Sequence, residues 1–254
     1  MGQSILITGG SSGLGAALAL EYAAKGVHLA LSGRNSTRLD AVAALCTLKD
    51  ATVETRLVDV TDQAAMQGWI ESVNASHPLD LVIANAGVTG ETVFSEDDVD
   101  ADRKARALFD INVTGVFNTV HPAINAMRLR GRGQIAIMSS LAGFRGLPSA
   151  PAYCASKAAV RSYGEGLRGA LRDDGVGVSV ICPGYVKSRM TDANDFPMPL
   201  LMEADKAARI IRKKLVRNPA VIAFPWPLAL AIRIMNVLPS GLRIRLLNRL
   251  PNKG

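Results

Sequence analysis

Cysteine is scarce in this 254-residue chain, and its scarcity limits the kinds of fold and site to expect. The three cysteines, Cys46, Cys154 and Cys182, are far apart in the sequence. They are too few and too scattered for a disulfide framework or a zinc site. We therefore expect no disulfide bonds, no metal site and a reducing compartment.

Segments that mark targeting or membrane insertion are also missing. Residues 3–8 form a strand-like run without a basic region ahead of a long apolar one, so we expect no signal peptide. Residues 219–232 lack polar side chains, but 14 residues interrupted by prolines are too short for a spanning helix, which needs about 20. With 48% hydrophobic and 20% charged residues, the chain has the composition of a globular protein.

Acidic residues are absent from residue 206 to residue 254, where 11 of the 29 Lys and Arg residues lie. The first 205 residues hold the other 18 basic residues and all 22 acidic ones, so the net charge of +7 comes from the end of the chain. Such an asymmetry raises the question of a membrane or nucleic-acid partner.

Strand-like and helix-like segments alternate along the chain. The apolar pattern predicts strands at residues 4–8, 27–32, 53–58, 79–84, 134–139, 176–182 and 220–224. It predicts helices at residues 13–25, 35–48, 62–75, 112–128, 152–171 and 203–216, with a polar stretch at 95–110. Because parallel strands need crossover connections, the alternation predicts a doubly wound α/β fold with helices on both faces of a parallel sheet.

A glycine-rich loop, Thr8-Gly9-Gly10-Ser11-Ser12-Gly13-Leu14-Gly15, joins the first strand to the first helix. Glycines let a backbone approach a pyrophosphate, which binds the N–H groups at the start of the helix. The loop favours a dinucleotide site, and the alternative is a turn that binds nothing. No Gly-Lys-Ser/Thr follows, so the loop is not a P-loop.

The loop spacing T-G-x-x-x-G-x-G resembles that of the short-chain dehydrogenase/reductase family. Further motifs of that family follow in order: Asn85-Ala86-Gly87, Asn112, Ser139-Ser140, Tyr153 to Lys157 as Y-x-x-x-K, and Pro183-Gly184. The resemblance covers residues 3–224. It implies a Rossmann sheet of about seven parallel strands in the order 3-2-1-4-5-6-7. It also implies one catalytic domain at 1–225, with a cofactor half at 1–135 and a catalytic and substrate half at 136–225.

Tyrosine and lysine in Y-x-x-x-K suit acid–base chemistry. A tyrosine with a pKa near ~10 needs a nearby cation to favour its phenolate, and Lys157 lies one helical turn after Tyr153. The resemblance assigns the substrate oxygen to Ser140, proton transfer to Tyr153, the nicotinamide ribose to Lys157 and a relay water to Asn112. Taken singly, each residue also has a purely structural explanation, as a packed aromatic, a solvated charge, a turn former or a backbone-bonding amide.

The cofactor is expected to be NADP(H) rather than NAD(H). Gly33 stands where NAD-binding units place an acid for the ribose 2′-OH, and Arg34 follows it. Arginine suits a 2′-phosphate, and Arg38 lies one turn beyond. The alternative is that Arg34 is a solvated loop charge. Ser12 stands where some NADP-dependent relatives have a basic residue.

We expect the cofactor site to be lined by residues from every strand end that carries a family motif. Asp59 and Val60 resemble the pair beside the adenine. Ser188 stands where relatives often have Thr for the carboxamide, with Thr191 nearby. The full set is Gly9, Ser11, Ser12, Gly13, Leu14, Gly15, Arg34, Arg38, Asp59, Val60, Asn85, Ala86, Gly87, Tyr153, Lys157, Pro183, Gly184, Val186 and Ser188.

Substrate specificity is expected in residues 189–202, which are apolar and rich in methionine. Such a segment adapts to apolar ligands, and the alternative is that it only packs beneath a lid. Arg145 and Arg189 are expected to be solvated rather than bound to a substrate carboxylate.

The chain after residue 225 departs from the family. Residues 228–238 and 242–250 read as two short apolar helices with arginines, within an amphipathic extension at 226–254. We order three explanations: packing over the pocket or between subunits, then contact with an anionic membrane, then nucleic acid. Nucleic acid is excluded from the predicted partners because the arginines lack stacking aromatics between them.

The sequence thus predicts an NADP(H)-dependent oxidoreductase that reduces a carbonyl, or oxidises the alcohol, of an apolar lipid-like or sterol-like molecule. The first alternative is a non-catalytic NADP(H)-binding sensor or scaffold that docks through its basic tail. A sugar-nucleotide epimerase or dehydratase is disfavoured by the short substrate region. We expect a homodimer or homotetramer in the cytoplasm or at the cytoplasmic face of a membrane.

Overall fold

Seven parallel strands form one sheet. The structure is a computed structural model that describes residues 2–89, 100–192 and 197–237. The strands are β1 (Ser4–Ile7), β2 (His28–Gly33), β3 (Thr52–Leu57), β4 (Leu81–Ala84), β5 (Gly133–Met138), β6 (Val176–Pro183) and β7 (Val221–Phe224). Their order is β3-β2-β1-β4-β5-β6-β7, and the paired strands run parallel, so the predicted fold class and strand order are confirmed.

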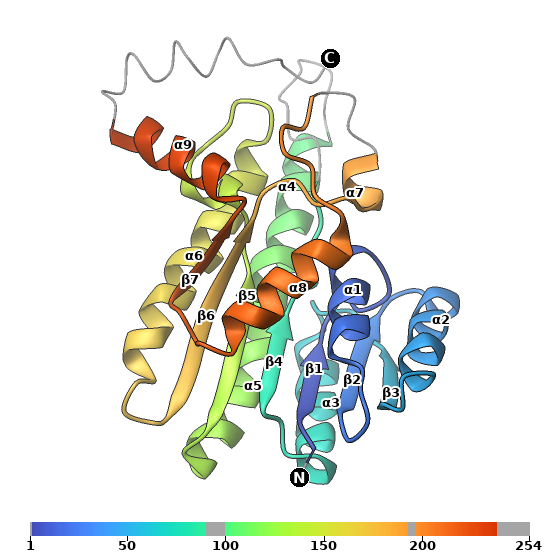
Figure 1. Ribbon diagram of the computed structural model, residues 1–254. Coiled ribbons are helices and arrows are strands. Elements are labelled where there is room, and N and C mark those ends of the chain that lie inside the picture. Colours follow the sequence, from blue (N-terminus) through green and yellow to red (C-terminus); the bar gives the residue numbers. More distant parts are fainter. Residues whose placement is uncertain (1, 90–99, 193–196, 238–254) are drawn as a thin grey trace.

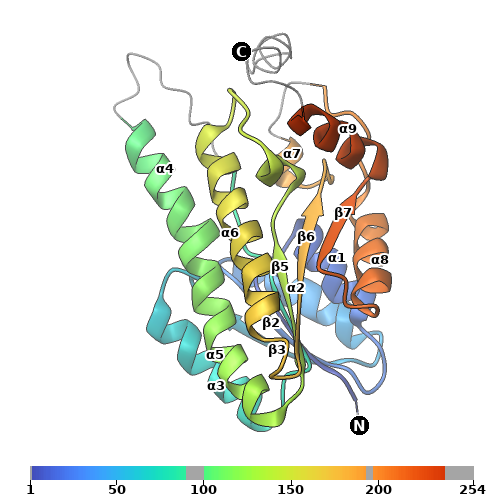
Figure 2. The same ribbon diagram turned by 90° about the vertical axis from the view of Figure 1, so that its left-hand side faces the viewer.

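Helices cover both faces of the sheet, which gives three layers (Figures 1 and 2). One face carries α1 (Gly13–Tyr22), α2 (Ser36–Thr47) and α8 (Ala204–Leu215). The other carries α3 (Gln63–Ser76), α5 (Gly115–Arg130) and α6 (Pro151–Ala170). The remaining helices are α4 (Ala101–Phe109), a π-helical turn η1 (Asp110–Thr114), a 3₁₀ turn η2 (Leu141–Phe144), α7 (Arg189–Asp192) and α9 (Trp226–Val237).

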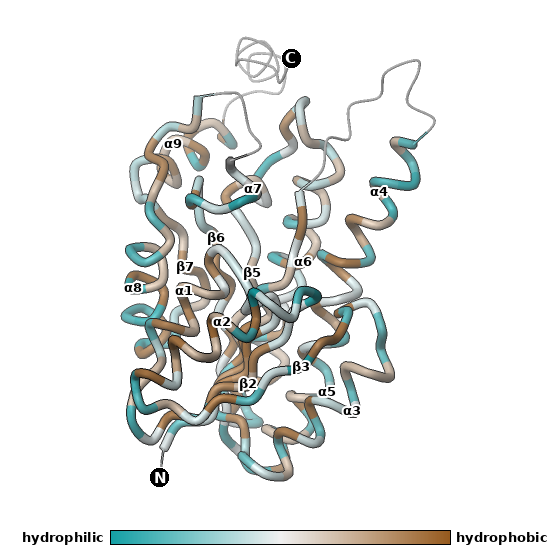
Figure 3. The backbone as a smooth tube through the Cα atoms, turned by 90° about the vertical axis from the view of Figure 1, so that its right-hand side faces the viewer, coloured by the Kyte–Doolittle hydropathy of each residue, from teal (hydrophilic) through white to brown (hydrophobic). Residues whose placement is uncertain are grey.

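The hydrophobic core has two halves, one on each side of the sheet. Along β1, Ile5 and Ile7 pack with the α1 side, whereas Leu6 packs with the α3 side, and all three are fully buried. This alternation follows from the two-residue period of a strand. Figure 3 shows apolar residues concentrated in the sheet and polar residues mixed with apolar ones along the surrounding helices. Continuous apolar runs in the sequence therefore become strands buried on both faces.

Local signals explain where several helices begin. Asn35 caps α2, since its Oδ1 accepts a hydrogen bond of 2.9 Å from the Arg38 amide. Asp62 caps α3 in the same way through the Ala65 amide, at 3.0 Å. Helix α1 ends at Tyr22 rather than at the predicted Lys25, because Ala23 already has extended backbone angles.

The predicted polar stretch at 95–110 proves to be helical from Ala101 onward. Only Ala101 and Leu108 of α4 are buried, and four of its nine residues are charged. Ion pairs one turn apart support the helix instead, such as Arg106 Nε to Asp102 Oδ2 at 2.8 Å. The turn η1 then joins α4 to α5. The helical region is therefore longer than periodicity predicts. Residues 95–99 lie outside the described residues.

Helix α9 lies across the carboxyl end of the sheet, above β7 (Figure 1). It packs on η2 and β6, where Ala229 is buried with Leu141, Val180 and Cys182. Its bounds agree with the first predicted tail helix, while the second, at 242–250, lies outside the described residues. None of the helices in the described ranges is both long and apolar enough to cross a bilayer.

Candidate active site

A cavity of about 1100 Å³ opens at the carboxyl ends of the parallel strands. This is the edge where doubly wound sheets bind ligands, because the strand order reverses there between β1 and β4. All nineteen residues predicted for the cofactor site line this cavity. They come from the segments that follow β1, β2, β3, β4 and β6, including the starts of α1 and α2, and from helix α6.

The glycine loop is held against the neighbouring strand end. Thr8 Oγ1 accepts hydrogen bonds from the amides of Asn85 and Ala86, at 3.1 and 3.2 Å. Asn85 Nδ2 donates to the Thr8 carbonyl at 2.9 Å. A side chain at Gly15 would collide with the Gly9 carbonyl, so glycine is required where the loop enters α1. The backbone at this edge is thus fixed by its own bonds.

The start of α1 is suited to an anion. Ser12 is the N-cap residue, but its side chain forms no capping hydrogen bond. Gly13 begins the helix with a positive φ of 54°, which glycine adopts without strain. The first amides of α1 therefore face the cavity without a side-chain cap, and they carry the positive end of the helix dipole. A pyrophosphate fits this arrangement.

The far end of the cavity is cationic. Arg34 and Arg38 both line it and are exposed. Arg34 Nη1 lies 3.9 Å from Asp59 Oδ2, and both side chains are open to solvent, so the pair is weak. A Cβ at Gly33 would lie 2.9 Å from Ser11 Oγ, so a larger residue at 33 requires Ser11 to move. The site thus presents two guanidinium groups and no acid at the position that NAD-binding units use.

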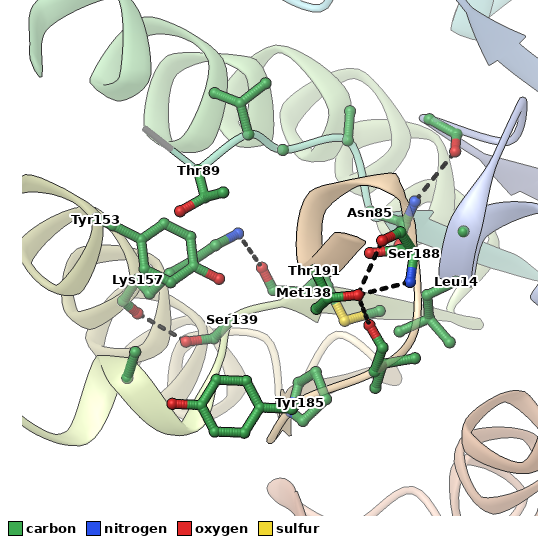
Figure 4. Close-up of a pocket in the computed structure, with 18 of the residues that line it drawn as sticks. Leu14, Asn85, Thr89, Met138, Ser139, Tyr153, Lys157, Tyr185, Ser188 and Thr191 are labelled. Atoms are coloured by element: carbon green, nitrogen blue, oxygen red, sulfur yellow. Dashed lines mark hydrogen bonds between the residues drawn. The ribbon is translucent and has the colours of Figure 1, made fainter. Parts of the chain in front are cut away.

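Tyr153 and Lys157 lie on one face of α6, one turn apart. The Lys157 Nζ is 5.9 Å from the centroid of the Tyr153 ring and donates to the Met138 carbonyl at 3.0 Å. Ser139 Oγ donates to the Lys157 carbonyl at 2.7 Å and so holds α6 against the end of β5. Figure 4 shows the Tyr153 hydroxyl and the Lys157 amine on the same side of the cavity.

Burial dominates the titration of this pair. It lowers the pKa of Lys157 to about 8, because the side chain is only 4% exposed and a buried cation is disfavoured. It also raises the pKa of Tyr153, against which a hydrogen bond from Ser140 acts to lower it. Lys157 is not among the causes of the Tyr153 shift, so its effect on the tyrosine pKa stays a prediction.

Ser140 and Asn112 are not among the residues that line the cavity, but each contacts a residue that does. Ser140 Oγ caps η2 by accepting from the Ala142 amide at 3.1 Å and donates to the Pro183 carbonyl at 3.4 Å. Its hydroxyl also forms a hydrogen bond with Tyr153, and this contact acts to lower the tyrosine pKa. Ser140, which follows β5, therefore contacts the hydroxyl of Tyr153.

Asn112 is fully buried in the π-helical turn η1. Its Oδ1 accepts from the Val88 amide at 2.8 Å, and its Nδ2 donates to the Val88 carbonyl at 2.9 Å and to Ser156 Oγ at 3.1 Å. Ser156 Oγ in turn donates to the Tyr153 carbonyl at 2.8 Å. The Asn112 side chain thus ties the loop after β4 to the helix that carries Tyr153.

In the segment after β6, the predicted cofactor residues line the cavity, but only some residues of the predicted specificity segment do. Ser188 lines the cavity beside the start of α1, since a Cβ at Gly13 would lie 3.1 Å from Ser188 Cβ. Thr191 also lines it, but its hydroxyl accepts from the Ser188 amide at 2.8 Å. Of the predicted specificity segment, Arg189, Thr191, Pro197 and Pro199 reach the cavity, and residues 193–196 lie outside the described residues.

The substrate end of the cavity has an apolar wall. Helix α9 contributes an apolar face, and the η2 region contributes another. The α9 residues recur at helical spacing, a signal that identifies one face of a helix. The wall consists of Leu141, Ala142, Leu147, Pro148, Leu228, Ala231, Ile232 and Met235. For α9, the structure shows packing over the pocket, the explanation placed first together with subunit packing.

Arg145 is the one basic residue expected to be solvated that the structure places differently. It lines the cavity, is half-buried, and its Nη1 donates to Asn236 Oδ1 at 2.9 Å. Asn236 Nδ2 donates to the Phe144 carbonyl at 3.2 Å, so the two residues join α9 to η2. Arg189 is exposed, as expected.

Comparison with known proteins agrees with this geometry. The sequence profile of the short chain dehydrogenases matches residues 3–196. The chain belongs to the short-chain dehydrogenase family. It is 42% identical over 245 residues to an uncharacterized oxidoreductase of Myxococcus xanthus, covering 94% of each chain. It is 34% identical over 248 residues to an uncharacterized oxidoreductase of Mycobacterium tuberculosis, covering 96% of each.

Solved short-chain dehydrogenases share the whole fold. One from Sphingobium yanoikuyae, in complex with NADPH, is 26% identical, with a TM-score of 0.80 over 99% of this chain and 98% of that one. Levodione reductase is 25% identical, with a TM-score of 0.80 over 90% and 98%. A further relative by sequence is the Arabidopsis thaliana 11-beta-hydroxysteroid dehydrogenase 1A, 34% identical over 77% of this chain and 55% of that protein. This short-chain dehydrogenase therefore belongs to the oxidoreductases.

Proposed function

We propose that the protein catalyses the NADP(H)-dependent reduction of a carbonyl group on an apolar small molecule, or the reverse oxidation. One observation carries this proposal: a single cavity joins a cationic end at Arg34 and Arg38 to an apolar end beside Tyr153. The first end suits a phosphorylated dinucleotide, and the second suits an apolar carbonyl compound next to a proton donor.

The proposed preference for NADP(H) over NAD(H) rests on two arginine charges and on the glycine at position 33. Arg34 and Arg38 supply forked donors for a 2′-phosphate, and Gly33 places no carboxylate at the end of β2. NADPH bound to the Sphingobium yanoikuyae relative supports the same choice. We place the phosphate beside Arg34, the adenine beside Asp59 and Val60, and the pyrophosphate at the start of α1.

The proposed chemistry divides the work between cofactor and protein. A bound nicotinamide supplies or accepts the hydride. Tyr153 donates the proton to the carbonyl oxygen, and Ser140 holds that oxygen by a hydrogen bond. Lys157 binds the ribose from its buried position, which adds a positive charge near the Tyr153 hydroxyl. Asn112 fixes the position of the loop after β4 relative to helix α6 through its hydrogen bonds to Val88 and Ser156.

The substrate class follows from the walls of the cavity. Leu141, Leu147, Ile232 and Met235 present hydrocarbon, and a methionine adapts to ligands of irregular shape. An apolar ketone or alcohol of lipid-like or sterol-like size fits such walls. The name of the Arabidopsis thaliana relative, a hydroxysteroid dehydrogenase, supports this class.

Two further proposals concern partners. The outer face of α9 exposes Trp226, Leu230, Ile234 and Val237, in a segment without acidic residues, and an anionic membrane surface suits this face. We also propose a homodimer or homotetramer formed through α5 and α6. The three cysteines are buried free thiols, which supports a cytoplasmic compartment.

The test is a fluorescence titration with NADPH and NADH, followed by turnover of an apolar ketone and aldehyde panel. We expect NADPH to bind tighter and to be oxidised by at least one apolar carbonyl. Arg34→Ala should weaken NADPH binding about tenfold or more and leave NADH binding unchanged. Arg56→Ala is the matched control, since Arg56 is exposed on β3 and does not line the cavity.

Two outcomes count against the proposal. Tighter binding of NADH would make Arg34 a solvated loop charge and overturn the cofactor assignment. Tight NADPH binding without turnover across the panel would favour a sensor that binds the cofactor without using it.

A further inference from the structure

A second cluster of polar side chains lies at the amino-terminal end of the sheet, far from the cavity. His28 begins β2, Glu54 lies in β3 and His77 follows the last residue of α3. One possible ligand atom from each residue lies within 4.8 Å of the other two. Two of the chain's three histidines are thus gathered at one point. Their separation in the sequence explains why no spacing motif revealed them.

Hydrogen bonds fix the tautomer of His28. Ser4 Oγ donates its hydrogen to the His77 carbonyl, at 3.1 Å. The same hydroxyl oxygen lies 3.3 Å from His28 Nδ1, and with its hydrogen already used it accepts from an Nδ1–H. His28 therefore carries its proton on Nδ1, and its Nε2 presents a lone pair.

The lone pair of His28 Nε2 faces a carboxylate oxygen of Glu54. His28 Nε2 lies 3.4 Å from Glu54 Oε1, a buried oxygen that has no hydrogen-bond partner within the described residues. Two electron-rich atoms held this close in a buried position call for a cation.

We propose that His28 Nε2, the Glu54 carboxylate and the His77 imidazole bind a divalent metal ion of the Zn²⁺ class. Two imidazoles and one carboxylate form an established zinc donor set, with water as the fourth ligand. The hydrogen bond from His28 Nδ1 to Ser4 is the outer-shell contact that ligating histidines usually make. This site goes beyond the proposed function and does not depend on it.

Metal binding requires one movement. The rings of His28 and His77 are stacked, with centroids 3.7 Å apart and planes 8° apart. A metal ion lies in the plane of each ring that binds it, so both rings cannot coordinate one ion while stacked. His77 is exposed at the end of α3, and its side chain has room to turn toward the ion. The bound ion would join β2, β3 and α3, so we expect it to act on stability.

The experiment measures Zn²⁺ binding to the full chain without a polyhistidine tag, by calorimetry and by thermal unfolding. We expect Zn²⁺ to bind and to raise the unfolding temperature of the wild-type protein. His77→Ala and Glu54→Gln should each weaken binding at least about tenfold. Both changes lie on side chains that are partly or fully exposed, and unfolding without Zn²⁺ verifies that the variants fold.

His121→Ala is the matched control, because His121 is the remaining histidine and lies on α5 next to Tyr163. It should bind Zn²⁺ as the wild-type protein does. Co²⁺ in place of Zn²⁺ should give the visible absorption of a tetrahedral nitrogen and oxygen site. The proposal is overturned if His77→Ala binds Zn²⁺ unchanged, if His121→Ala weakens binding as much, or if Co²⁺ shows thiolate charge-transfer absorption. NADPH affinity is a separate readout, so failure here leaves the proposed enzyme activity untouched.

Discussion

At the scale of single residues, the burial of Tyr153 and Lys157 lowers the free energy of unfolding. Lys157 is buried, and its amine meets one carbonyl oxygen, that of Met138, instead of bulk water. The pKa of about 8 means that the folded protein disfavours the lysine cation. Tyr153 is disfavoured as a phenolate for the same reason. Burial thus places two reactive groups together at the expense of stability.

Tyr153→Phe should abolish turnover and preserve cofactor binding. The variant keeps the ring but removes the hydroxyl that transfers the proton, and general acid catalysis contributes about 10²–10⁴-fold. The measurement is steady-state turnover of an accepted carbonyl together with NADPH titration. Tyr163→Phe, on the same helix but outside the cavity wall, is the control and should stay active. A Tyr153→Phe enzyme with most of its activity would refute the role.

Lys157→Met should stabilise the protein at neutral pH. The folded pKa of about 8 lies below the ordinary 10.5, so the folded state binds fewer protons between these values and stability rises with pH there. Below pH 8 the full cost of up to about 3 kcal/mol is present. The variant removes this cost and loses a hydrogen bond of about 1 kcal/mol, so we expect a net gain of about 2 kcal/mol.

Thermal unfolding at pH 7 and near pH 10 checks this prediction. The difference between Lys157→Met and the wild-type protein should shrink as the pH rises above 8. Lys213→Met, on the exposed side of α8, should show no such pH dependence. An equal difference at both pH values would mean that the lysine charge is not the cause.

The residues of the site differ in how well the sequence predicts them. Gly9, Tyr153 and Lys157 belong to motifs with fixed spacing, and the structure brings them to one cavity. The internal bonds of Asn112 could not be predicted, because its partners Val88 and Ser156 are distant in sequence and have no motif of their own. The placement of Arg145 depends on Asn236, 91 residues away.

At the scale of elements, apolar runs predict strands better than they predict helices. Strands β1, β2, β4, β5 and β6 lie where the apolar runs lie, because this part of the sheet is buried on both faces, whereas the edge strand β3 is largely exposed. Helix α4 escaped prediction because only Ala101 and Leu108 face the interior. Helix α9 was predicted, but its position was not, since an apolar helix can cover a pocket, a partner or a lipid surface.

Two faces of α9 allow a test of membrane contact. Leu228, Ile232 and Met235 face the cavity, whereas Trp226 is 73% and Ile234 57% exposed. Trp226→Ser with Ile234→Ser should therefore reduce binding to anionic vesicles at least about tenfold, because each side chain adds about 1.5–3 kcal/mol when buried in lipid. Flotation with phosphatidylglycerol and phosphatidylcholine vesicles measures this.

Leu129→Ser is the matched control for that change. Leu129 is 91% exposed, but it lies near the end of α5 rather than on α9. It should float with anionic vesicles as the wild-type protein does. Equal recovery of the wild-type protein in the soluble fraction with and without anionic lipid would contradict the membrane proposal.

At the scale of the whole molecule, the cavity unites distant parts of the chain. It is bounded by loops after six strands and by α9, so a ligand there contacts both halves of the sheet. NADPH at a hundred times its dissociation constant should stabilise the fold by about 2.7 kcal/mol. For a chain of this size, we expect the unfolding temperature to rise by roughly 5–10 °C. Thermal scans with NADPH and NADH at equal concentration measure the effect, and equal shifts would contradict the proposed preference.

The position of helix α9 in the chain affects how the substrate range can evolve. Every residue proposed for cofactor binding or proton transfer precedes β7, whereas one wall of the substrate end follows it. Recombination downstream of Phe224 would exchange that wall as a block and leave the reaction chemistry intact. A related gene could thus acquire a new substrate through a single crossover, and chimeras joined at this point offer a direct way to reshape selectivity.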